Sequence, residues 1–130
     1  MRFHGVNLMV DDVQKTVDFY DDAFGMKPGF ADPDGTFTVL TFPGETPGPG
    51  SVVLAVEHWS KIEDFASPTP PSAVRIGLEF EDVDAAYKKA LAAGATSAKA
   101  PIVRPWGQKI AVVKDNSGFL IELCAPVEYK

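Results

Sequence analysis

The sequence has little of what marks several protein classes. It holds one cysteine in 130 residues, so no disulfide can form within the chain, which favours a reducing cytoplasm. No apolar run approaches the ~20 residues of a membrane-spanning helix, and the first residues lack the apolar core of a signal peptide. The 12 Lys+Arg are outnumbered by 18 Asp+Glu, which argues against nucleic-acid binding because phosphate affinity needs a basic patch. We expect a cytoplasmic protein with no nucleic-acid or membrane partner.

The residues that are present have the composition of an ordinary folded domain. Hydrophobic residues make up 45% of the chain and charged residues 23%, which excludes a wholly disordered chain. A chain of this length buries roughly two-thirds of its unfolded surface, enough for a core without disulfides. We expect a single domain at 1–130, or two very small halves that share a core.

An internal repeat is the most informative feature. Residues 6–13 read VNLMVDDV, and residues 76–83 read IGLEFEDV. Apolar residues alternate in both segments, which predicts a strand with one buried face. Acidic residues then precede apolar residues at helical spacing, as is typical of a helix N-terminus. Gly25 and Gly94 are expected to end the two helices.

Three strand-like runs follow each expected helix. They span 26–31, 36–42 and 51–57 in the first half, and 95–100, 108–114 and 119–124 in the second. Prolines crowd the segment between the halves and make it extended rather than helical. The chain is predicted to be α+β, with a βαβββ module at 1–60, a Pro-rich linker at 61–73 and a second βαβββ module at 74–126.

One face of each four-stranded sheet is expected to lie uncovered by its helix. If the first helix covers the face that carries Leu8, strand alternation puts Asn7 and Met9 on the other face. By the same reasoning, Arg75 and Glu122 occupy the uncovered face in the second half. Two modules can cover these faces by curving around a shared hollow, within one chain or across a dimer. Such a cup is the usual shape of a small-molecule site.

Several motifs together resemble the glyoxalase/bleomycin-resistance/extradiol-dioxygenase group, the vicinal oxygen chelate superfamily. These motifs are LMVDDV at 8–13, VDFY at 17–20, FGM at 24–26, PWG at 105–107 and DNSGFLIEL at 115–123. The resemblance covers nearly the whole chain. It implies two paired βαβββ modules that form a curved mixed sheet around a cup, and a homodimer. It says less about activity, because this fold hosts metal enzymes, thiol transferases and drug-binding proteins.

The resemblance also places the family's metal site. In its metal enzymes four cup-facing positions coordinate a divalent ion, and here they correspond to Gly5, Leu54, Arg75 and Glu122. Glu122 matches, whereas Gly5 and Leu54 have no donor atoms and a guanidinium has no lone pair. Because a metal needs about three protein ligands, we expect no metal and no other cofactor.

Because of two histidines, metal binding stays an alternative. His4 is one position from Gly5, and a shift of one residue in a strand turns the side chain to the other face. His58 directly follows Glu57 at the end of an expected strand. Otherwise, His4 is expected to lie at a strand edge and His58 in a solvated loop.

An ion pair between Arg75 and Glu122 is expected where the family holds its metal. An uncompensated buried carboxylate is strongly unfavourable, and a guanidinium can neutralise it and still bind a ligand oxygen. Alternatively the pair is purely internal, or Glu79 competes for Arg75. Trp106 offers an indole for stacking, or it packs an interface. The predicted ligand site consists of Asn7, Met9, Leu54, Val56, Arg75, Trp106 and Glu122.

The sequence predicts a metal-free protein that binds a partly apolar or aromatic small molecule in the cup. The bleomycin-resistance branch of the family acts in this way, by sequestration, so antibiotic resistance is one implied role. The alternative is an enzyme, either a glyoxalase-like metal-dependent lyase or isomerase or a dioxygenase-related protein. Glu122 is then the only catalytic candidate, as a general base, although Arg75 would favour its ionised form.

Overall fold

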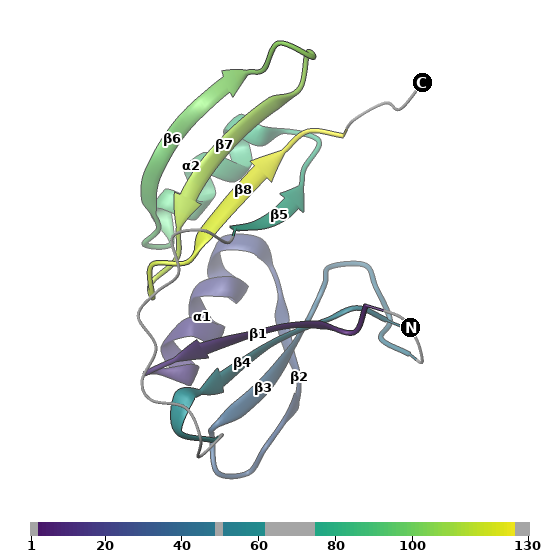
Figure 1. Cartoon of the computed structure of the whole chain (residues 1–130), viewed down its shortest axis with the longest axis vertical. Helices are drawn as coiled ribbons and strands as arrows, with labels where there is room; N and C mark the ends of the chain where they lie inside the picture. Colours follow the sequence, from purple (N-terminus) through teal and green to yellow (C-terminus); the bar gives the residue numbers. More distant parts are fainter. Residues whose placement is uncertain (1–2, 49–50, 62–74, 127–130) are drawn as a thin grey trace. The chain divides into compact units, whose positions relative to one another are not determined.

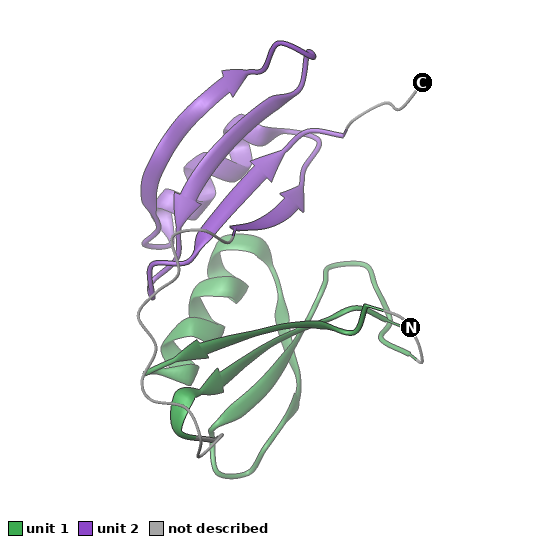
Figure 2. Cartoon of the chain, viewed as in Figure 1, with its two compact units in different colours: residues 1–69 green, residues 70–130 purple. Residues whose placement is uncertain are grey.

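The computed structural model describes residues 3–48, 51–61 and 75–126. The chain divides into two units, residues 1–69 and residues 70–130 (Figure 2). The expected linker at 61–73 falls, from residue 62 onward, outside the described residues.

Unit 1 contains one helix and one four-stranded sheet. Its elements are β1 (Gly5–Val10), α1 (Val13–Phe24), β2 (Lys27–Ala31), β3 (Phe37–Thr41), β4 (Val53–His58) and a short 3-10 helix, η1 (Trp59–Lys61). The strands lie in the order β1-β4-β3-β2 (Figure 1). β1 pairs with β4 in parallel, and the other pairs are antiparallel.

Unit 2 repeats this architecture. Its elements are β5 (Arg75–Glu79), α2 (Val83–Ala92), β6 (Thr96–Val103), β7 (Lys109–Lys114) and β8 (Leu120–Cys124). The strand order is β5-β8-β7-β6, again with a parallel pair, β5 and β8, and antiparallel neighbours. The predicted α+β fold of two βαβββ modules with mixed sheets is confirmed.

The helix ends follow from the residues that the sequence supplies there. Asp12 caps α1 and accepts a hydrogen bond from the backbone N–H of Lys15 at 2.9 Å, and Asp82 caps α2 from the same position of the repeat. Such caps satisfy N–H groups that have no partner inside the helix. Gly25 ends α1 with φ of 70°, and Gly94 follows the end of α2 with φ of 108°. The predicted helix boundaries are therefore confirmed.

Each unit has its own core between its helix and one face of its sheet. In unit 1 the sheet contributes Leu8, Val10, Leu40, Leu54 and Val56, and α1 contributes Val17, Phe19, Tyr20 and Phe24. In unit 2 the buried sheet residues are Leu78, Ala111, Val113, Ile121 and Leu123, packed against Ala86 and Ala90 of α2. The opposite face of each sheet is not covered by its helix, as Figure 1 shows for both units.

The strand register corrects the expected direction of two side chains. Leu54 pairs with Val6, and Val56 pairs with Leu8. Paired residues on neighbouring strands point to the same face, so Leu54 and Val56 lie on the face that α1 covers, and both are buried. The expectation that they share the uncovered face with Asn7 and Met9 was wrong by one residue, which is enough to reverse a strand's faces.

The expected strands are otherwise close to the observed ones, and the largest extension is in β6. β6 was expected to end at residue 100, but it continues through Pro101 to Val103. Proline is tolerated there because β6 is an edge strand and its pairing with β7 is irregular between Lys99 and Ile102.

Candidate functional site

Arg75 and Glu122 form an ion pair on the uncovered face of unit 2. Arg75 begins β5, and Glu122 lies in the middle of β8, with Arg75 Nε 3.3 Å from Glu122 Oε2. The strand partner of Glu122 is Gly77, not Arg75. A Cβ added at Gly77 would meet nothing within 4 Å. The Arg75 side chain therefore reaches along β5 to Glu122 over a position that carries no side chain.

The surroundings of this pair are apolar toward the sheet and open toward the solvent. Val112 pairs with Glu122 and is buried, and the next residue on that face of β7, Ile110, is fully buried. The Arg75 side chain is 54% exposed and that of Glu122 22%. Arg75 can therefore present N–H groups to a ligand while it neutralises Glu122. The predicted pair is present, and Glu79 is not its acid partner.

Cys124 follows Glu122 on the same face of β8. Its thiol donates to the carbonyl oxygen of Leu78 at 3.6 Å. Burial raises the pKa of Cys124, and the negative charges of Glu122 and Glu79 raise it further. A raised pKa lowers the fraction of reactive thiolate at neutral pH, so these surroundings do not favour a nucleophilic role for Cys124.

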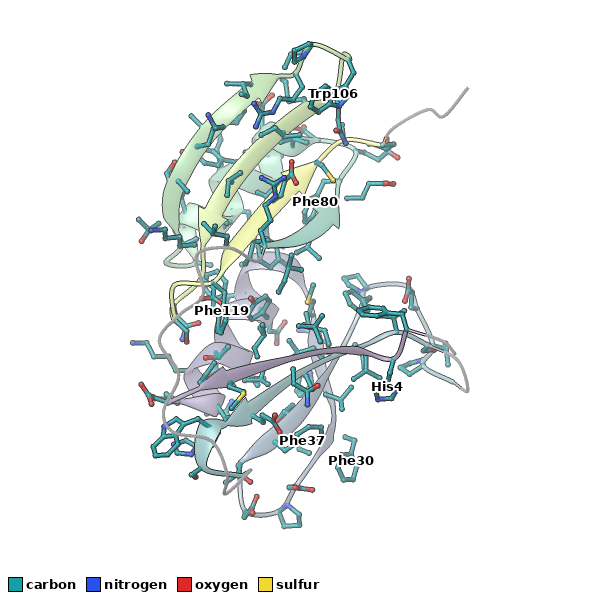
Figure 3. All side chains as sticks on the ribbon, viewed as in Figure 1. His4, Phe30, Phe37, Phe80, Trp106 and Phe119 are labelled. Atoms are coloured by element: carbon teal, nitrogen blue, oxygen red, sulfur yellow. The ribbon has the colours of Figure 1, made fainter. Side chains whose placement is uncertain are left out.

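Trp106 lies in the turn between β6 and β7, at the end of that hairpin (Figure 3). Its side chain is 66% exposed, and its indole N–H donates to Gln108 Oε1 at 3.0 Å. Gln108 in turn donates to the carbonyl oxygen of Ala125 at 2.8 Å. This chain of bonds holds an exposed flat ring at the edge of unit 2, and among the described residues no hydrogen bond or ion pair joins Trp106 to the Arg75–Glu122 pair.

The uncovered face of unit 1 has a polar centre, formed by the predicted site residue Asn7 and by Glu57, which was not predicted as a site residue. Glu57 of β4 is only 5% exposed, and the side-chain amide of Asn7 donates to its Oε1 at 3.4 Å. Met9 and Phe37 are the strand partners of Glu57, and both are partly buried. β4 continues to His58, so Glu57 lies within the strand and not at its end. A correct prediction of the β1–β4 pairing would have placed Glu57 beside Met9 on this face.

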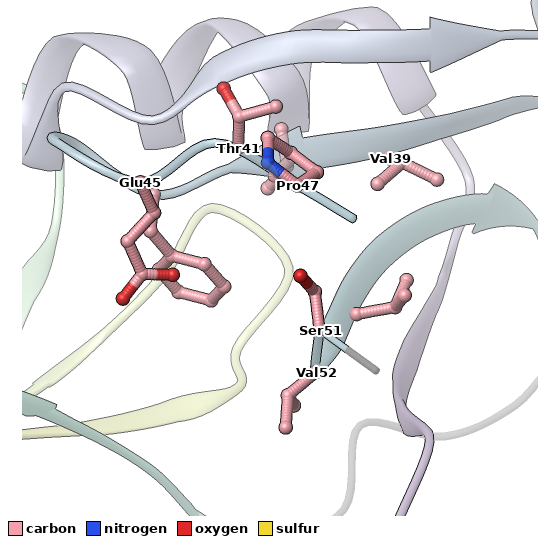
Figure 4. A pocket seen from close by; sticks show the side chains of 9 residues that line it. Val39, Thr41, Glu45, Pro47, Ser51 and Val52 are labelled. Carbon is pink, nitrogen blue, oxygen red and sulfur yellow. The ribbon is translucent and has the colours of Figure 1, made fainter. Parts of the chain in front are cut away.

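A pocket lies on the same unit where β3 and β4 are joined (Figure 4). Its walls are mostly apolar and comprise Val39, Leu40, Thr41, Phe42, Glu45, Pro47, Ser51, Val52 and Val53. Val39 pairs with Ala55, the residue between Val53 and Glu57 on this face. The pocket therefore continues the uncovered face that carries Asn7 and Glu57.

The residues at the family's metal positions do not fit a metal. Gly77 and Glu122 are strand partners in unit 2, as Asn7 and Ala55 are in unit 1. Ala55, not Leu54, is thus the repeat equivalent of Glu122, and it also lacks a donor atom. At Gly5 even a Cβ would overlap the carbonyl oxygen of Val53. Within residues 3–48, 51–61 and 75–126, no three His, Cys, Asp or Glu side chains gather closely enough to hold a metal ion.

The two histidines do not supply the missing ligands. His58 is the strand partner of Val10 and so lies on the side of Leu54, away from Asn7. Its Nδ1 is 2.6 Å from Ser60 Oγ, and its ring packs on Trp59. His4 is exposed and precedes β1, where its carbonyl oxygen accepts from the Val53 N–H at 2.8 Å. Neither lies in a cluster of metal-ligating side chains.

Comparisons with known proteins agree with this architecture. The family model of the Glyoxalase/Bleomycin resistance protein/Dioxygenase superfamily matches residues 2–123. An uncharacterized protein of Mycobacterium bovis is 35% identical over 93% of this chain and 81% of its own length. A superfamily member from Sphaerobacter thermophilus has a TM-score of 0.75 and 28% identity, covering 97% of this chain and 98% of its own.

A more distant structure shares the fold alone. The glyoxalase-related enzyme from Fulvimarina pelagi has a TM-score of 0.80 at 19% identity, over 97% of this chain and 88% of its own. The matched sequence, the duplicated βαβββ order and the mixed sheets lead to one conclusion. This chain belongs to the glyoxalase/bleomycin resistance protein/dioxygenase superfamily.

Proposed function

We propose that this protein is a metal-free small-molecule-binding protein that holds a partly apolar or aromatic ligand. The observation that carries the proposal is the Arg75–Glu122 ion pair, whose atoms are 3.3 Å apart at two positions where the resemblance expects metal ligands. Arginine offers no lone pair to a metal, and it holds the one available carboxylate. The half-exposed guanidinium, the apolar residues beside it and the exposed Trp106 ring suit an organic ligand.

Two measurements test this function. Metal analysis after mild purification should find far less than one equivalent of nickel, zinc, manganese or iron per chain; near one equivalent would instead favour the glyoxalase-like lyase or isomerase, or the dioxygenase-related enzyme. Tryptophan fluorescence should then be titrated with a panel of neutral, anionic and cationic aromatic compounds. A compound that binds the wild type should bind Arg75→Ala and Trp106→Ala at least about tenfold more weakly, the loss of one charged hydrogen bond or one stacking contact.

A matched control separates binding from general effects of charge. Lys88→Ala also removes one positive charge from unit 2, but Lys88 is exposed on α2, away from the uncovered face. Its affinity should equal that of the wild type. Unchanged affinity in both Arg75→Ala and Trp106→Ala contradicts the proposed site.

The assembly and setting of the protein are part of the proposal. A homodimer would cover apolar side chains that are exposed in one chain, among them Phe3, Ile102 and Val103. The free thiol of Cys124 suits a reducing cytoplasm. In the described part of the chain, no helix is long and apolar enough to cross a membrane. Light scattering of the purified protein should give twice the 14.0 kDa mass of one chain.

A further inference from the structure

We infer that the uncovered face of unit 1 binds the primary ammonium group of an amphipathic organic cation, through Glu57. This inference rests on the proposed function, that the protein binds small molecules, and adds a separate site in unit 1 with the chemical class of its ligand. The site belongs to unit 1 and uses none of the residues of the Arg75–Glu122 pair. It consists of Glu57 and Asn7 with the apolar side chains around them.

The first step is the state of Glu57. Glu57 is only 5% exposed, yet within the described part of the chain its side chain accepts a single hydrogen bond, from the Asn7 amide at a long 3.4 Å. Among residues 3–48, 51–61 and 75–126, no lysine, arginine or histidine forms an ion pair with it. A carboxylate has room for about four hydrogen bonds, and a carboxylate with few partners is costly to remove from water. Glu57 therefore has unused capacity for a cationic donor.

The second step is the shape and chemistry of the surface around Glu57. Met9 and Phe37 flank it on the two neighbouring strands. Phe30 lies beside Phe37, with ring centroids 6.3 Å apart (Figure 3), and is 65% exposed. Aromatic faces attract organic cations, and a methionine packs adaptably against the apolar part of a ligand. A compact ammonium can reach the small exposed part of Glu57, whereas a bulky quaternary group cannot.

The third step is the path for the rest of the ligand. From Phe37 the uncovered face continues past Val39 to the apolar pocket of Figure 4. A strand advances about 3.3 Å per residue, so Val39 lies about 7 Å along β3 from Phe37. A two-carbon chain that ends in a phenyl ring spans that length. The face thus matches a cation at one end and an apolar group at the other.

Isothermal titration calorimetry with 2-phenylethylammonium tests the inference. We expect binding to the wild type, and weaker binding of the neutral, similarly sized 2-phenylethanol. Glu57→Gln keeps the size of the side chain but removes its charge, and should weaken ammonium binding about ten- to a hundredfold, the effect of one charged hydrogen bond. Phe30→Ala should weaken it a few fold. Asp22→Asn removes a negative charge at an exposed position of α1 and should leave ammonium binding unchanged.

Thermal unfolding supplies a readout that a purely structural Glu57 would not give. Without ligand, Glu57→Gln should melt at a higher temperature than the wild type, because an amide is less costly to bury than a carboxylate. A lower melting temperature indicates a structural Asn7–Glu57 bond and overturns the inference. Ammonium binding that responds to Glu122→Gln but not to Glu57→Gln also overturns it, while leaving the proposed function intact. A changed oligomeric state in Glu57→Gln with unchanged ammonium affinity would show that a second copy covers this face, and would equally overturn it.

Discussion

Arg75 Nε lies 3.3 Å from Glu122 Oε2, although the two residues are not strand partners. Glu122 pairs with Gly77, whose missing side chain leaves open the space through which the guanidinium approaches. The geometry of the pair therefore depends on a third residue as well as on the two charges. The candidate site can be altered at Gly77 without changing either charged group.

Gly77→Leu should separate ligand affinity from stability. The new side chain would occupy the space beside Glu122 and displace the Arg75 guanidinium, so the affinity for an aromatic ligand should fall about tenfold or more. The melting temperature should change little, because replacing a strand glycine reduces the freedom of the unfolded chain and offsets the loss of a largely exposed ion pair. Fluorescence titration and thermal unfolding measure the two quantities. Gly77→Ala is the control, and undiminished affinity in Gly77→Leu would show that this space is not needed.

Gly5→Ala should destabilise the protein by about 2 kcal/mol or more, as forced overpacking does. The added Cβ would overlap the carbonyl oxygen of Val53, where β1 and β4 approach closely. Denaturant unfolding gives the free energy of unfolding. Gly77→Ala, where nothing obstructs a Cβ, should change this free energy little. Equal stability of the two variants would refute the close approach at Gly5, and with it the reason why no larger ligand residue fits there.

Leu54→Ala tests the corrected face of β4. Leu54 is 4% exposed on the face covered by α1, so its truncation should lower the free energy of unfolding by about 3 kcal/mol, as in other buried leucines. Met9→Ala, on the uncovered face, should cost less because Met9 is only partly buried. A direct loss of ligand affinity in Leu54→Ala, with stability retained, would return Leu54 to the binding face.

Cys124 should react slowly with a thiol reagent such as dithionitrobenzoate, and Glu122→Gln should speed the reaction. Burial and the charges of Glu122 and Glu79 raise the pKa of this thiol. Removing one of those charges lowers the pKa, so a larger fraction is thiolate at mildly alkaline pH. The rate of absorbance change measures this. Glu81→Gln removes an exposed charge of the same unit that is not among these causes, and a similar rate in both variants would disprove the effect of Glu122.

Pairs of residues that lie close in sequence could be predicted well. Asp12 and Asp82 cap their helices, and Gly25 adopts the left-handed conformation that ends α1. Alternation along single strands also placed Asn7, Arg75 and Glu122 on the uncovered faces. These features depend on a few neighbouring residues, so the local sequence contains the necessary information. The shared cup between the modules stays a prediction.

Register between strands could not be predicted in the same way. Leu54 and Glu57 lie in a run of apolar residues, VVLAVEH at 52–58, in which both faces of β4 look alike. β4 lies between β1 and β3 in the sheet, and its four central residues are buried whichever face they point to. Alternation of apolar and polar residues is therefore absent there. Only the pairing with β1 distinguishes the faces, and that pairing joins residues far apart in the chain.

By itself, the sequence determined the duplicated βαβββ order, the helix ends and the presence of one arginine and one carboxylate where the family's metal enzymes have ligands. Short-range capping and periodicity are sufficient for the strand and helix order and the helix ends, and the family resemblance implies the metal positions. The tertiary structure decided which face of β4 is uncovered, that Glu57 is buried beside Asn7, and that Gly77 leaves room for Arg75 to reach Glu122. These depend on long-range strand pairing, because the position of a side chain on a sheet is fixed by its neighbours across strands as well as along the chain.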